Sequence, residues 1–346
     1  MKTYKNLWEK LISKENFEQA FKNAIRGKTK RYDVQKFLEN KEVNLENLRQ
    51  QVILGIWEPS SYKSKIIYEP KKREIFITKL QDRIVHHAIM LVLKPILEPK
   101  MILNTFSCIN NRGPHKASRK CAEYTRKYKY CLKCDIRKFY PSINQKILSN
   151  MFHRLIKDFK FMLILDAVIF SFPGGKNCPI GNYTSQWFGN FYLLSLDLFV
   201  YHTLKCSAYL RYCDDFLLFS NSKNLLHIWR EQIRVFIDRI LKLSFSKDFV
   251  FNTKQGVDFC GYRHFKDYVK LRKTTALRLR RRIKKLFNAV ENNSILDVVK
   301  ANGQISSARG TLSFCCSYNF NCKVKFEFTE FVVWSLFKET TNKSFV

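Results

Sequence analysis

The 346-residue sequence lacks an apolar run of the length that a membrane-spanning helix needs, about 18 to 20 residues. Its longest apolar stretches, such as residues 161–172, are short, and Asp166 interrupts this one. The N-terminal residues, Met-Lys-Thr-Tyr-Lys-Asn-Leu-Trp, lack the apolar core of a signal peptide. We therefore expect a soluble protein of the cytoplasm that makes no membrane contact.

The cysteines lack the pattern of a disulfide framework. There are eleven, an odd number with irregular spacing, and several lie among apolar residues. This pattern favours reduced core residues. Cys131 and Cys134 have the C-x-x-C spacing of a zinc or redox site. No second pair follows at zinc-ribbon spacing, however, and residues three apart in a strand face opposite sides, so we expect no metal there.

Acidic residues are scarce, because 29 Asp and Glu stand against 62 Lys and Arg, which gives a formal net charge of +33. Such an excess favours a polyanionic partner, most simply nucleic acid, since each phosphate contact releases counterions. An anionic membrane surface is the competing explanation. The sequence has no internal repeat and no low-complexity tail. Its length predicts two or three subdomains.

Apolar periodicity and turn residues predict the order of the elements along the chain. We expect helices over most of 1–57, two strands joined by a basic turn within 60–77, helices over 82–97 and 116–127, a strand over 131–139, helices over 184–204 and 225–243, strands near 249–251 and over 257–262, and a basic run over 270–285 followed by helical residues.

Two adjacent carboxylates, Asp214 and Asp215, lie between short runs of aromatic and aliphatic residues. This pattern predicts a β-hairpin whose turn carries the acids. Buried strands rarely place two charges side by side without compensation, since desolvating each costs several kcal/mol. A divalent cation with oxygen ligands would compensate them. A polar turn on a surface hairpin is the alternative interpretation.

Asp135 is a third acid in a similar setting, because it lies on an apolar strand that is followed by aromatic residues. Two-metal phosphoryl transfer needs a small set of carboxylates that hold two ions roughly 4 Å apart. Asp135 from one strand and the Asp214–Asp215 pair from a neighbouring hairpin would supply that set. A helix-proximal cap or an ion pair is the alternative for Asp135 alone.

A glycine-rich loop, residues 173–181, precedes the predicted apolar helix, and residues 179–190 at their junction lie between the two acidic segments. Gly181 would let the backbone come close to a base or a sugar, and Ser185 and Gln186 offer hydrogen bonds near the helix start. A plain helix cap is the alternative interpretation of this loop taken alone.

In this order the segments resemble the motifs of reverse transcriptases. Residues 135–140 are similar to motif A, residues 180–186 to motif B and Tyr212-Cys-Asp-Asp215 to the Y-x-D-D motif C. Phe259-Cys-Gly-Tyr262 is similar to the F-L-G-Y primer grip, with Cys in the Leu position. Residues 70–75 and 82–87 are similar to the fingers motifs of prokaryotic members. The resemblance covers about residues 1–325.

Most specifically, the sequence resembles the reverse transcriptases of diversity-generating retroelements of bacteria and phages. Their motif B reads I/V/L-G-x-x-x-S-Q, as in Ile180-Gly to Ser185-Gln186 here, whereas retroviral and many intron enzymes have Q-G-x-x-x-S-P. The resemblance implies copying of a template RNA into cDNA, errors opposite template adenines, and a small basic accessory protein. Cys213 and Gly189 depart from the residues that are common at these positions, but neither departure removes a ligand.

Two rival functions stay open. The first is another reverse transcriptase, of the defence-associated, retron or intron type; motif B speaks against the intron type. The second is a catalytically silent polymerase fold that only binds RNA, and the presence of all three acids speaks against it.

The resemblance implies a role for each matching residue. Two Mg²⁺ ions, for which Mn²⁺ could substitute, would be held by Asp135, Asp214, Asp215 and the backbone carbonyl of Ile136. Lys247 would donate a proton to pyrophosphate. The expected nucleotide-binding residues are Lys71 and Arg73 on the triphosphate, Tyr140 against the sugar, and Ile180, Gly181 and Gln186 near the base. Phe259, Gly261 and Tyr262 would form the primer grip, and Arg278, Arg280, Arg281 and Arg282 would follow nucleic-acid phosphates.

The implied fold is α+β, a right-hand polymerase with helical fingers, an antiparallel-sheet palm and a small helical thumb. We expect an N-terminal helical extension over 1–57, fingers over 58–130, a palm over 131–265 with a fingers insertion around 144–180, and a thumb over 266–346. The expected partners are template RNA, the cDNA or primer, deoxynucleoside triphosphates and the accessory protein.

Overall fold

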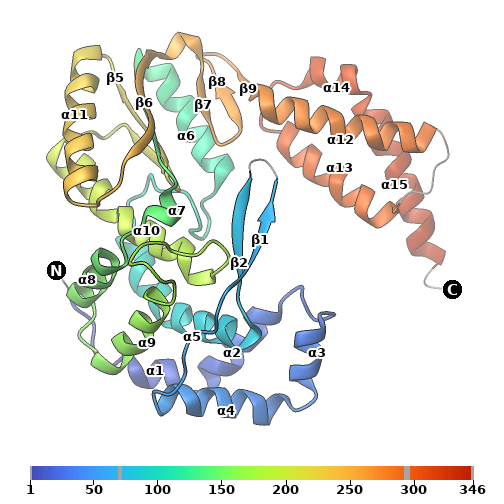
Figure 1. Cartoon of the computed structure of the whole chain (residues 1–346). Coiled ribbons are helices and arrows are strands. Elements are labelled where there is room, and N and C mark those ends of the chain that lie inside the picture. The colour runs from blue at the N-terminus through green and yellow to red at the C-terminus, as the bar shows by residue number, and fades with distance from the viewer. Residues whose placement is uncertain (1, 69–71, 292–296, 344–346) are drawn as a thin grey trace. The chain divides into compact units, whose positions relative to one another are not determined.

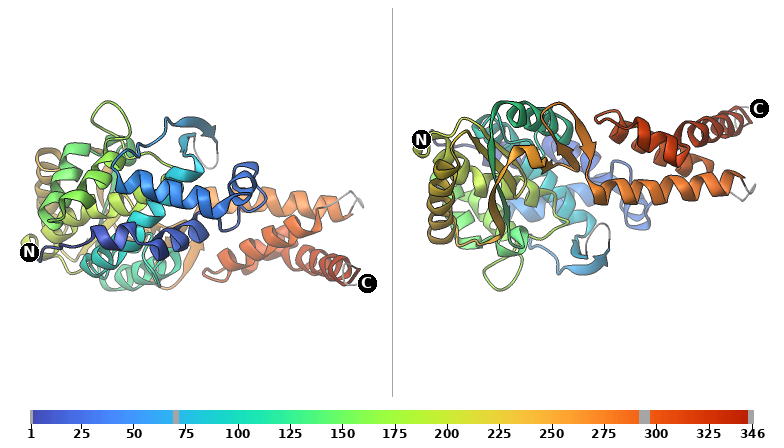
Figure 2. Two further views of the ribbon diagram at one scale, coloured as in Figure 1. Left: turned by 90° about the horizontal axis from the view of Figure 1, so that it is seen from below. Right: turned by 90° about the horizontal axis from the view of Figure 1, so that it is seen from above.

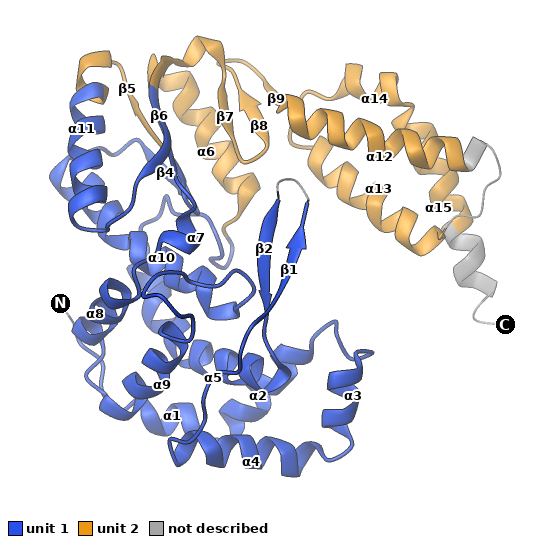
Figure 3. Cartoon of the chain, viewed as in Figure 1, with its two compact units in different colours: residues 1–111, 133–216, 227–249 blue, residues 112–132, 217–226, 250–346 orange. Residues whose placement is uncertain are grey.

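The computed structural model describes residues 2–68, 72–291 and 297–343 of the chain (Figure 1). The described chain separates into two compact units (Figure 3). Unit 1 holds residues 1–111, 133–216 and 227–249, and unit 2 holds residues 112–132, 217–226 and 250–346. No helix of the described part is long and apolar enough to cross a membrane.

The first part of unit 1 is helical, as predicted. It contains α1 (Trp8–Ile12), α2 (Lys14–Ile25), α3 (Tyr32–Leu38), α4 (Lys41–Ile53) and α5 (Leu80–Leu97), which a short 3-10 turn follows. In α2, Phe17, Phe21 and Ala24 recur at helical spacing and are buried. This apolar face packs along α5, whose own residues are mostly buried, so α5 is the central helix of the group (Figure 2).

Strands β1 (Lys63–Ile67) and β2 (Arg73–Ile77) form an antiparallel hairpin in which Lys63 pairs with Ile77 and Ile67 with Arg73. This confirms the prediction of two strands within 60–77. Their residues are exposed or half-buried, so little apolar surface holds the hairpin in place. One firm attachment is the hydrogen bond from the Phe76 N–H to the Ile180 carbonyl, 2.7 Å.

A four-stranded sheet has the order β4-β5-β3-β6, with β3 (Tyr130–Ile136), β4 (Tyr209–Tyr212), β5 (Asp215–Ser220) and β6 (Phe245–Asn252). β4 and β5 form the predicted hairpin. The predicted strand over 131–139 was too long, because Lys138 takes a left-handed conformation, φ +44°, and Phe139 belongs to the short helix α7 (Phe139–Ser142). The other helices here are α8 (Gln145–Leu155), α9 (Phe159–Ile169), α10 (Tyr183–Leu198), a π-helical turn (Phe199–Thr203) and α11 (Lys223–Arg239).

Unit 2 contains α6 (Pro114–Lys127) and an antiparallel sheet of β7 (Val257–Phe259), β8 (Tyr262–His264) and β9 (Val269–Leu271). The prediction of one strand over 257–262 was wrong, because a turn at Cys260 and Gly261 divides it into β7 and β8. Buried His264 joins α6 to this sheet, since its Nε2 lies 2.7 Å from Ser118 Oγ and its Nδ1 lies 3.0 Å from the Val257 carbonyl oxygen.

The rest of unit 2 is helical: α12 (Lys273–Glu291), α13 (Val298–Leu312), α14 (Tyr318–Val324) and α15 (Phe326–Lys343), drawn from orange to red in Figure 2. Leu279, Ile283 and Leu286 recur on one face of α12 and are buried against apolar residues of α13 and α15. The mixture of helices with small antiparallel sheets agrees with the α+β class expected from the sequence.

Candidate active site

The β4–β5 turn carries Asp214, and Asp215 opens β5. Cys213 has φ +55°, a left-handed conformation that is uncommon for a residue with a side chain. Burial, together with the neighbouring Asp135 and Asp215 carboxylates, raises the pKa of Asp214 to about 6. The structure therefore brings the three predicted acids close enough to repel one another.

Asp135 and Asp215 each have a hydrogen-bond donor that the sequence did not reveal. Lys133 Nζ lies 3.1 Å from Asp215 Oδ2, across the neighbouring strands β3 and β5. Ser246, on β6, donates its hydroxyl to Asp135 Oδ2 and lies 3.2 Å from the Asp135 carbonyl oxygen. These donors offset part of the repulsion among the carboxylates.

The three carboxylates have the donor chemistry of a divalent-cation site, because hard cations prefer carboxylate oxygens. Within the part of the chain that the structure describes, however, no three acidic, histidine or cysteine side chains already converge on a metal position. The three carboxylates therefore have suitable chemistry but do not point to one common position. Asp135 contacts Ser246, and Asp215 contacts Lys133. Both contacts use the Oδ2 oxygen of the carboxylate, so neither occupies all of its acceptor positions.

The loop before α10 is held tightly to β2. A Cβ atom at Gly181 would lie 2.0 Å from the Phe76 carbonyl oxygen, so no side chain fits there, and φ is +130°. Gly181 thus lets the backbone of the loop come close to strand β2. Ser185 is buried and donates its hydroxyl to the Pro179 carbonyl, 2.7 Å. Gln186 is exposed and Ile180 is half-buried, so both have accessible surface.

Two predicted nucleotide-binding residues lie near the acids. Arg73 opens β2 and is exposed, and its positive charge acts to lower the pKa of Asp214, which places the guanidinium within electrostatic reach of the turn. Tyr140 lies in α7, and burial together with neighbouring Cys213 and Asp214 raises the pKa of its hydroxyl. A Cβ atom at Gly189 of α10 would lie 3.2 Å from the Tyr140 ring. Lys71 lies outside the described residues.

Lys247 is exposed on β6, next to Ser246 in sequence. Ile136 ends β3 with a buried side chain.

The predicted primer grip lies in unit 2 and has little exposed side-chain surface. Phe259 and Tyr262 pair across the β7–β8 hairpin, and both are buried, at 0% and 3% exposure. The Tyr262 hydroxyl donates to the Thr311 carbonyl, 3.0 Å. Cys260 and Gly261, with φ +48° and +87°, form the turn, as type I′ turns require. The turn backbone rather than the rings is therefore the accessible part of this segment.

The four arginines of α12 lie outside the positions that form its buried face. Arg278, Arg280 and Arg281 are exposed and Arg282 is half-buried, whereas Leu279 is buried. The helix thus presents a row of cations to solvent.

A family model described as reverse transcriptase (RNA-dependent DNA polymerase) matches residues 63–264, more than half of the chain. The chain belongs to the reverse transcriptase family. This confirms the predicted fold class, a polymerase of the right-hand type, and the predicted enzyme class, RNA-directed DNA polymerase. The match includes the three acids, the loop at 180–186 and the β7–β8 hairpin.

Two further proteins are similar to this reverse transcriptase. YkfC of Escherichia coli (strain K12) is 22% identical over 275 residues, which cover 64% of this chain and 71% of YkfC. Among solved structures, telomerase from Candida albicans, determined with a TWJ fragment of telomeric RNA, is 12% identical with a TM-score of 0.47. That similarity covers 78% of this chain, which spans 55% of the telomerase chain.

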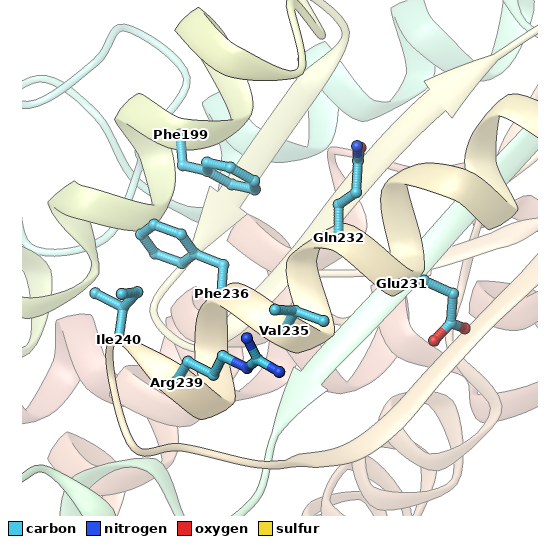
Figure 4. Close-up of a pocket in the computed structure, with 7 residues that line it drawn as sticks. All are labelled: Phe199, Glu231, Gln232, Val235, Phe236, Arg239 and Ile240. Atoms are coloured by element: carbon cyan, nitrogen blue, oxygen red, sulfur yellow. The ribbon is translucent and has the colours of Figure 1, made fainter.

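A hollow of about 460 Å³ in unit 1 is lined mainly by apolar side chains of α11 and the π-helical turn (Figure 4). Its lining residues are Phe199, Glu231, Gln232, Val235, Phe236, Arg239 and Ile240. None of them is among the predicted site residues of this reverse transcriptase.

The sequence held one signal for the missed donors. Lys133 is two residues before Asp135 on the same predicted strand, and side chains two apart lie on one face. From this spacing, Lys133 could have been predicted to lie beside the acids as a cation. Nothing in the sequence marks Ser246, because its contact with Asp135 joins residues 111 positions apart.

Proposed function

We propose that this reverse transcriptase extends a primer on a template RNA, by attack of the primer 3′-hydroxyl on the α-phosphate of a deoxynucleoside triphosphate. The observation that supports this best is that Asp135 and Asp215 lie on the neighbouring central strands β3 and β5 and that Asp214 lies in the turn before β5, where burial and mutual repulsion raise its pKa to about 6. Buried like charges of this kind are typical of sites that bind cations or transfer protons.

Asp135, Asp214, Asp215 and the Ile136 carbonyl would hold two Mg²⁺ ions. When bound, such ions make the attacking hydroxyl more acidic and neutralise charge on the leaving pyrophosphate. Ser246 and Lys133, which contact Asp135 and Asp215, would orient these two carboxylates toward the ions. Lys133 remains beside the site as a cation that can balance the incoming phosphates.

The other site residues bind and orient the substrates. Arg73, together with Lys71, contacts the triphosphate through charge-assisted hydrogen bonds. Tyr140, packed against α10 at Gly189, excludes a 2′-hydroxyl by bulk. Ile180 and Gln186 contact the base, and Lys247 donates a proton to the pyrophosphate.

In unit 2, the backbone of the Cys260–Gly261 turn contacts the primer, while Phe259 and Tyr262 hold the turn in place. Arg278, Arg280, Arg281 and Arg282 contact template or primer phosphates, with affinity that falls as salt rises.

The template-copying reaction serves sequence diversification, with errors concentrated opposite template adenines and with a small basic accessory protein as partner. Ile180-Gly to Ser185-Gln186 supports this retroelement type, as the motif B pattern of that group. The exposure of Gln186 and the half-exposure of Ile180 agree with a role at the base.

Primer extension on an RNA template with Mg²⁺, followed by sequencing of the cDNA, tests the proposal. The Asp214→Asn, Asp215→Asn double variant is the control, and companion RNA and the candidate accessory protein are added in parallel reactions. Extension that the double variant lacks, with errors opposite adenines, supports both the activity and the retroelement type.

Two other results would change the proposal. Extension with an even, low error rate would keep the polymerase and favour a retron or defence role. Tight RNA binding without extension in any mixture would replace it with a silent RNA-binding fold. If the diversification proposal is correct, substitutions at Arg73, Ile180 and Gln186 alter the error spectrum.

A further inference from the structure

Unit 1 contains a completely buried ion pair that contacts the turn between β4 and β5, residues Cys213 and Asp214, which we call the acidic turn. Arg211 on β4 and Asp197 on α10 are both 0% exposed. Arg211 Nε lies 2.7 Å from Asp197 Oδ1, and Nη2 lies 2.5 Å from Oδ2, which is a two-pronged contact. Asp197 also accepts hydrogen bonds from the hydroxyls of Tyr209, 2.7 Å, and Thr105, 3.0 Å. The carboxylate is thus fully occupied, and it fixes the guanidinium in one orientation.

The remaining nitrogen of that guanidinium reaches the acidic turn. Arg211 Nη1 lies 3.1 Å from the Cys213 carbonyl oxygen and 3.1 Å from Asn190 Oδ1. Asn190 in turn donates its side-chain amide to the Ser107 carbonyl, 2.8 Å, and Ser107 Oγ lies 2.8 Å from Cys213 Sγ. Both the carbonyl and the side chain of Cys213 are therefore held by one connected network.

Within this turn, Cys213 has the strained backbone conformation. Its φ of +55° costs a residue with a side chain about 1–2 kcal/mol, so the turn would relax unless other contacts fixed it. The Cys213 carbonyl and the Asp214 N–H share one rigid peptide plane. A hydrogen bond to that carbonyl thus fixes the direction in which the backbone enters Asp214.

The burial of these charges is not explained by stability alone. Removing a carboxylate and a guanidinium from water costs several kcal/mol each, and apolar residues of similar volume are often equally stable in place of a buried pair. Only the guanidinium can contact Asp197, Asn190 and the Cys213 carbonyl at once, because its donors form a planar fork.

The geometry points to Arg211 as a positioning residue, held by Asp197 and Asn190, that sets the Cys213–Asp214 peptide for divalent-cation binding. The inference rests on the proposed function only in that the cation is the one the polymerase reaction would use. Arg211 itself touches no reacting atom.

The test measures Mn²⁺ binding to the full chain by electron paramagnetic resonance, without nucleic acid, beside thermal unfolding and primer extension. Arg211→Lys keeps the charge but not the planar fork, and Arg211→Met with Asp197→Leu replaces the pair by apolar side chains. Tyr192→Phe is the matched control, because it removes a buried 2.6 Å hydrogen bond from the same helix α10 to the Leu241 carbonyl. The Asp214→Asn, Asp215→Asn variant gives the background of non-specific binding.

We expect both Arg211 variants to weaken Mn²⁺ binding roughly ten-fold, as loss of a ligand-orienting partner typically does. Tyr192→Phe should lower the unfolding temperature without changing Mn²⁺ binding. If the Arg211 variants fail to fold, Asn190→Ala, which leaves the ion pair intact and frees one side of Nη1, should weaken binding by a smaller factor.

If the Arg211 variants fold and their affinity for Mn²⁺ is unchanged, the inference is overturned. If they do not fold, unchanged Mn²⁺ affinity of Asn190→Ala overturns it. In either case, primer extension by the unmodified chain still tests the proposed function. Conversely, variant-dependent Mn²⁺ binding in a chain that extends no primer would support the positioning role and reject the polymerase proposal.

Discussion

Two β-hairpins of this chain have two-residue turns. In each turn, the first residue is a cysteine with positive φ. In unit 1 the turn between β4 and β5 is Cys213-Asp214, and in unit 2 the turn between β7 and β8 is Cys260-Gly261. Only Cys213 has positive φ in the first turn, whereas both residues do in the second. The first turn thus has the φ pattern for which glycine is favoured at the first position, yet that position holds a cysteine.

The two hairpins are fixed in different ways. The second hairpin follows ordinary rules, since Gly261 adopts φ +87° easily and the rings of Phe259 and Tyr262 are buried on either side. In the first, Asp214 is the residue on which the proposed chemistry depends, and contacts to Arg211 and Ser107 hold the conformation of Cys213. The conformation of Cys213 thus depends on side-chain contacts, one from Arg211 on β4 and one from Ser107 outside the hairpin, whereas the second turn has a glycine at one of its two positions of positive φ.

The largest difference between the hairpins should appear in activity. Asp214→Asn should lower the rate of primer extension by about a thousand-fold or more, an effect of about 4 kcal/mol on the barrier, because a ligand of the proposed cations is lost. Gly261→Ala should keep extension within about ten-fold. Single-turnover kinetics on one primer–template measures both. Equal losses in the two variants would contradict the division between a chemical and a shaping turn.

A second difference should appear in how stability depends on pH. The pKa of Asp214 is raised from 3.8 to about 6, so the folded state binds this proton more tightly than the unfolded state does. The contribution of Asp214 to the free energy of unfolding is therefore greatest below the unfolded pKa, falls as pH rises, and is lost above about pH 6.

Asn does not ionise, so Asp214→Asn should raise the free energy of unfolding by about 2 kcal/mol at pH 8 and change it little at pH 3.5. Urea unfolding in EDTA at both pH values provides the measurement. Gly261→Ala, the control from the other hairpin, should show the same difference at both pH values. A pH-independent effect of Asp214→Asn would show that repulsion at the acidic turn is small.

The smallest expected effect concerns the turn backbone of unit 2. Gly261→Ala should lower the free energy of unfolding by about 1 kcal/mol, because alanine is strained at φ +87°, although its Cβ atom would make only an ordinary contact, 3.7 Å from Thr275 Oγ1. Gly303→Ala, in the middle of α13, where a Cβ atom would meet nothing within 4 Å, should instead raise it by up to about 1 kcal/mol, through helix propensity. Thermal unfolding of both variants shows whether each change raises or lowers stability. If both changes alter stability in the same direction, backbone strain at Gly261 is excluded.

Local patterns were sufficient to predict most elements. The aromatic and aliphatic runs on either side of Asp214 and Asp215 predicted a hairpin, and it forms; the apolar spacing in α2 and α5 predicted helices, and they form. The failures lie where a short turn interrupts an otherwise regular run. Phe139 reads as part of a strand until Lys138 takes φ +44°, and residues 257–262 read as one strand until Cys260 and Gly261 reverse it.

The acids of the candidate site could be named from the sequence, but not their partners. Ser246 and Lys133 meet Asp135 and Asp215 through the strand order β4-β5-β3-β6, which no local pattern encodes. Asp197 did leave a trace, since it is a lone charge in an apolar segment, whereas Arg211 lies only three residues before Asp214. Only the structure shows that they face each other and support the turn.

The contact between Gly181 and β2 decides which parts of this polymerase can be exchanged between relatives. Since a Cβ atom at Gly181 would collide with the Phe76 carbonyl, the loop and the β1–β2 hairpin form a matched pair of surfaces. A chimera that imports a foreign loop should therefore import the hairpin too, including Arg73 on β2. In a library built to alter copying errors, Gly181 should be kept while Ile180 and Gln186 are randomised.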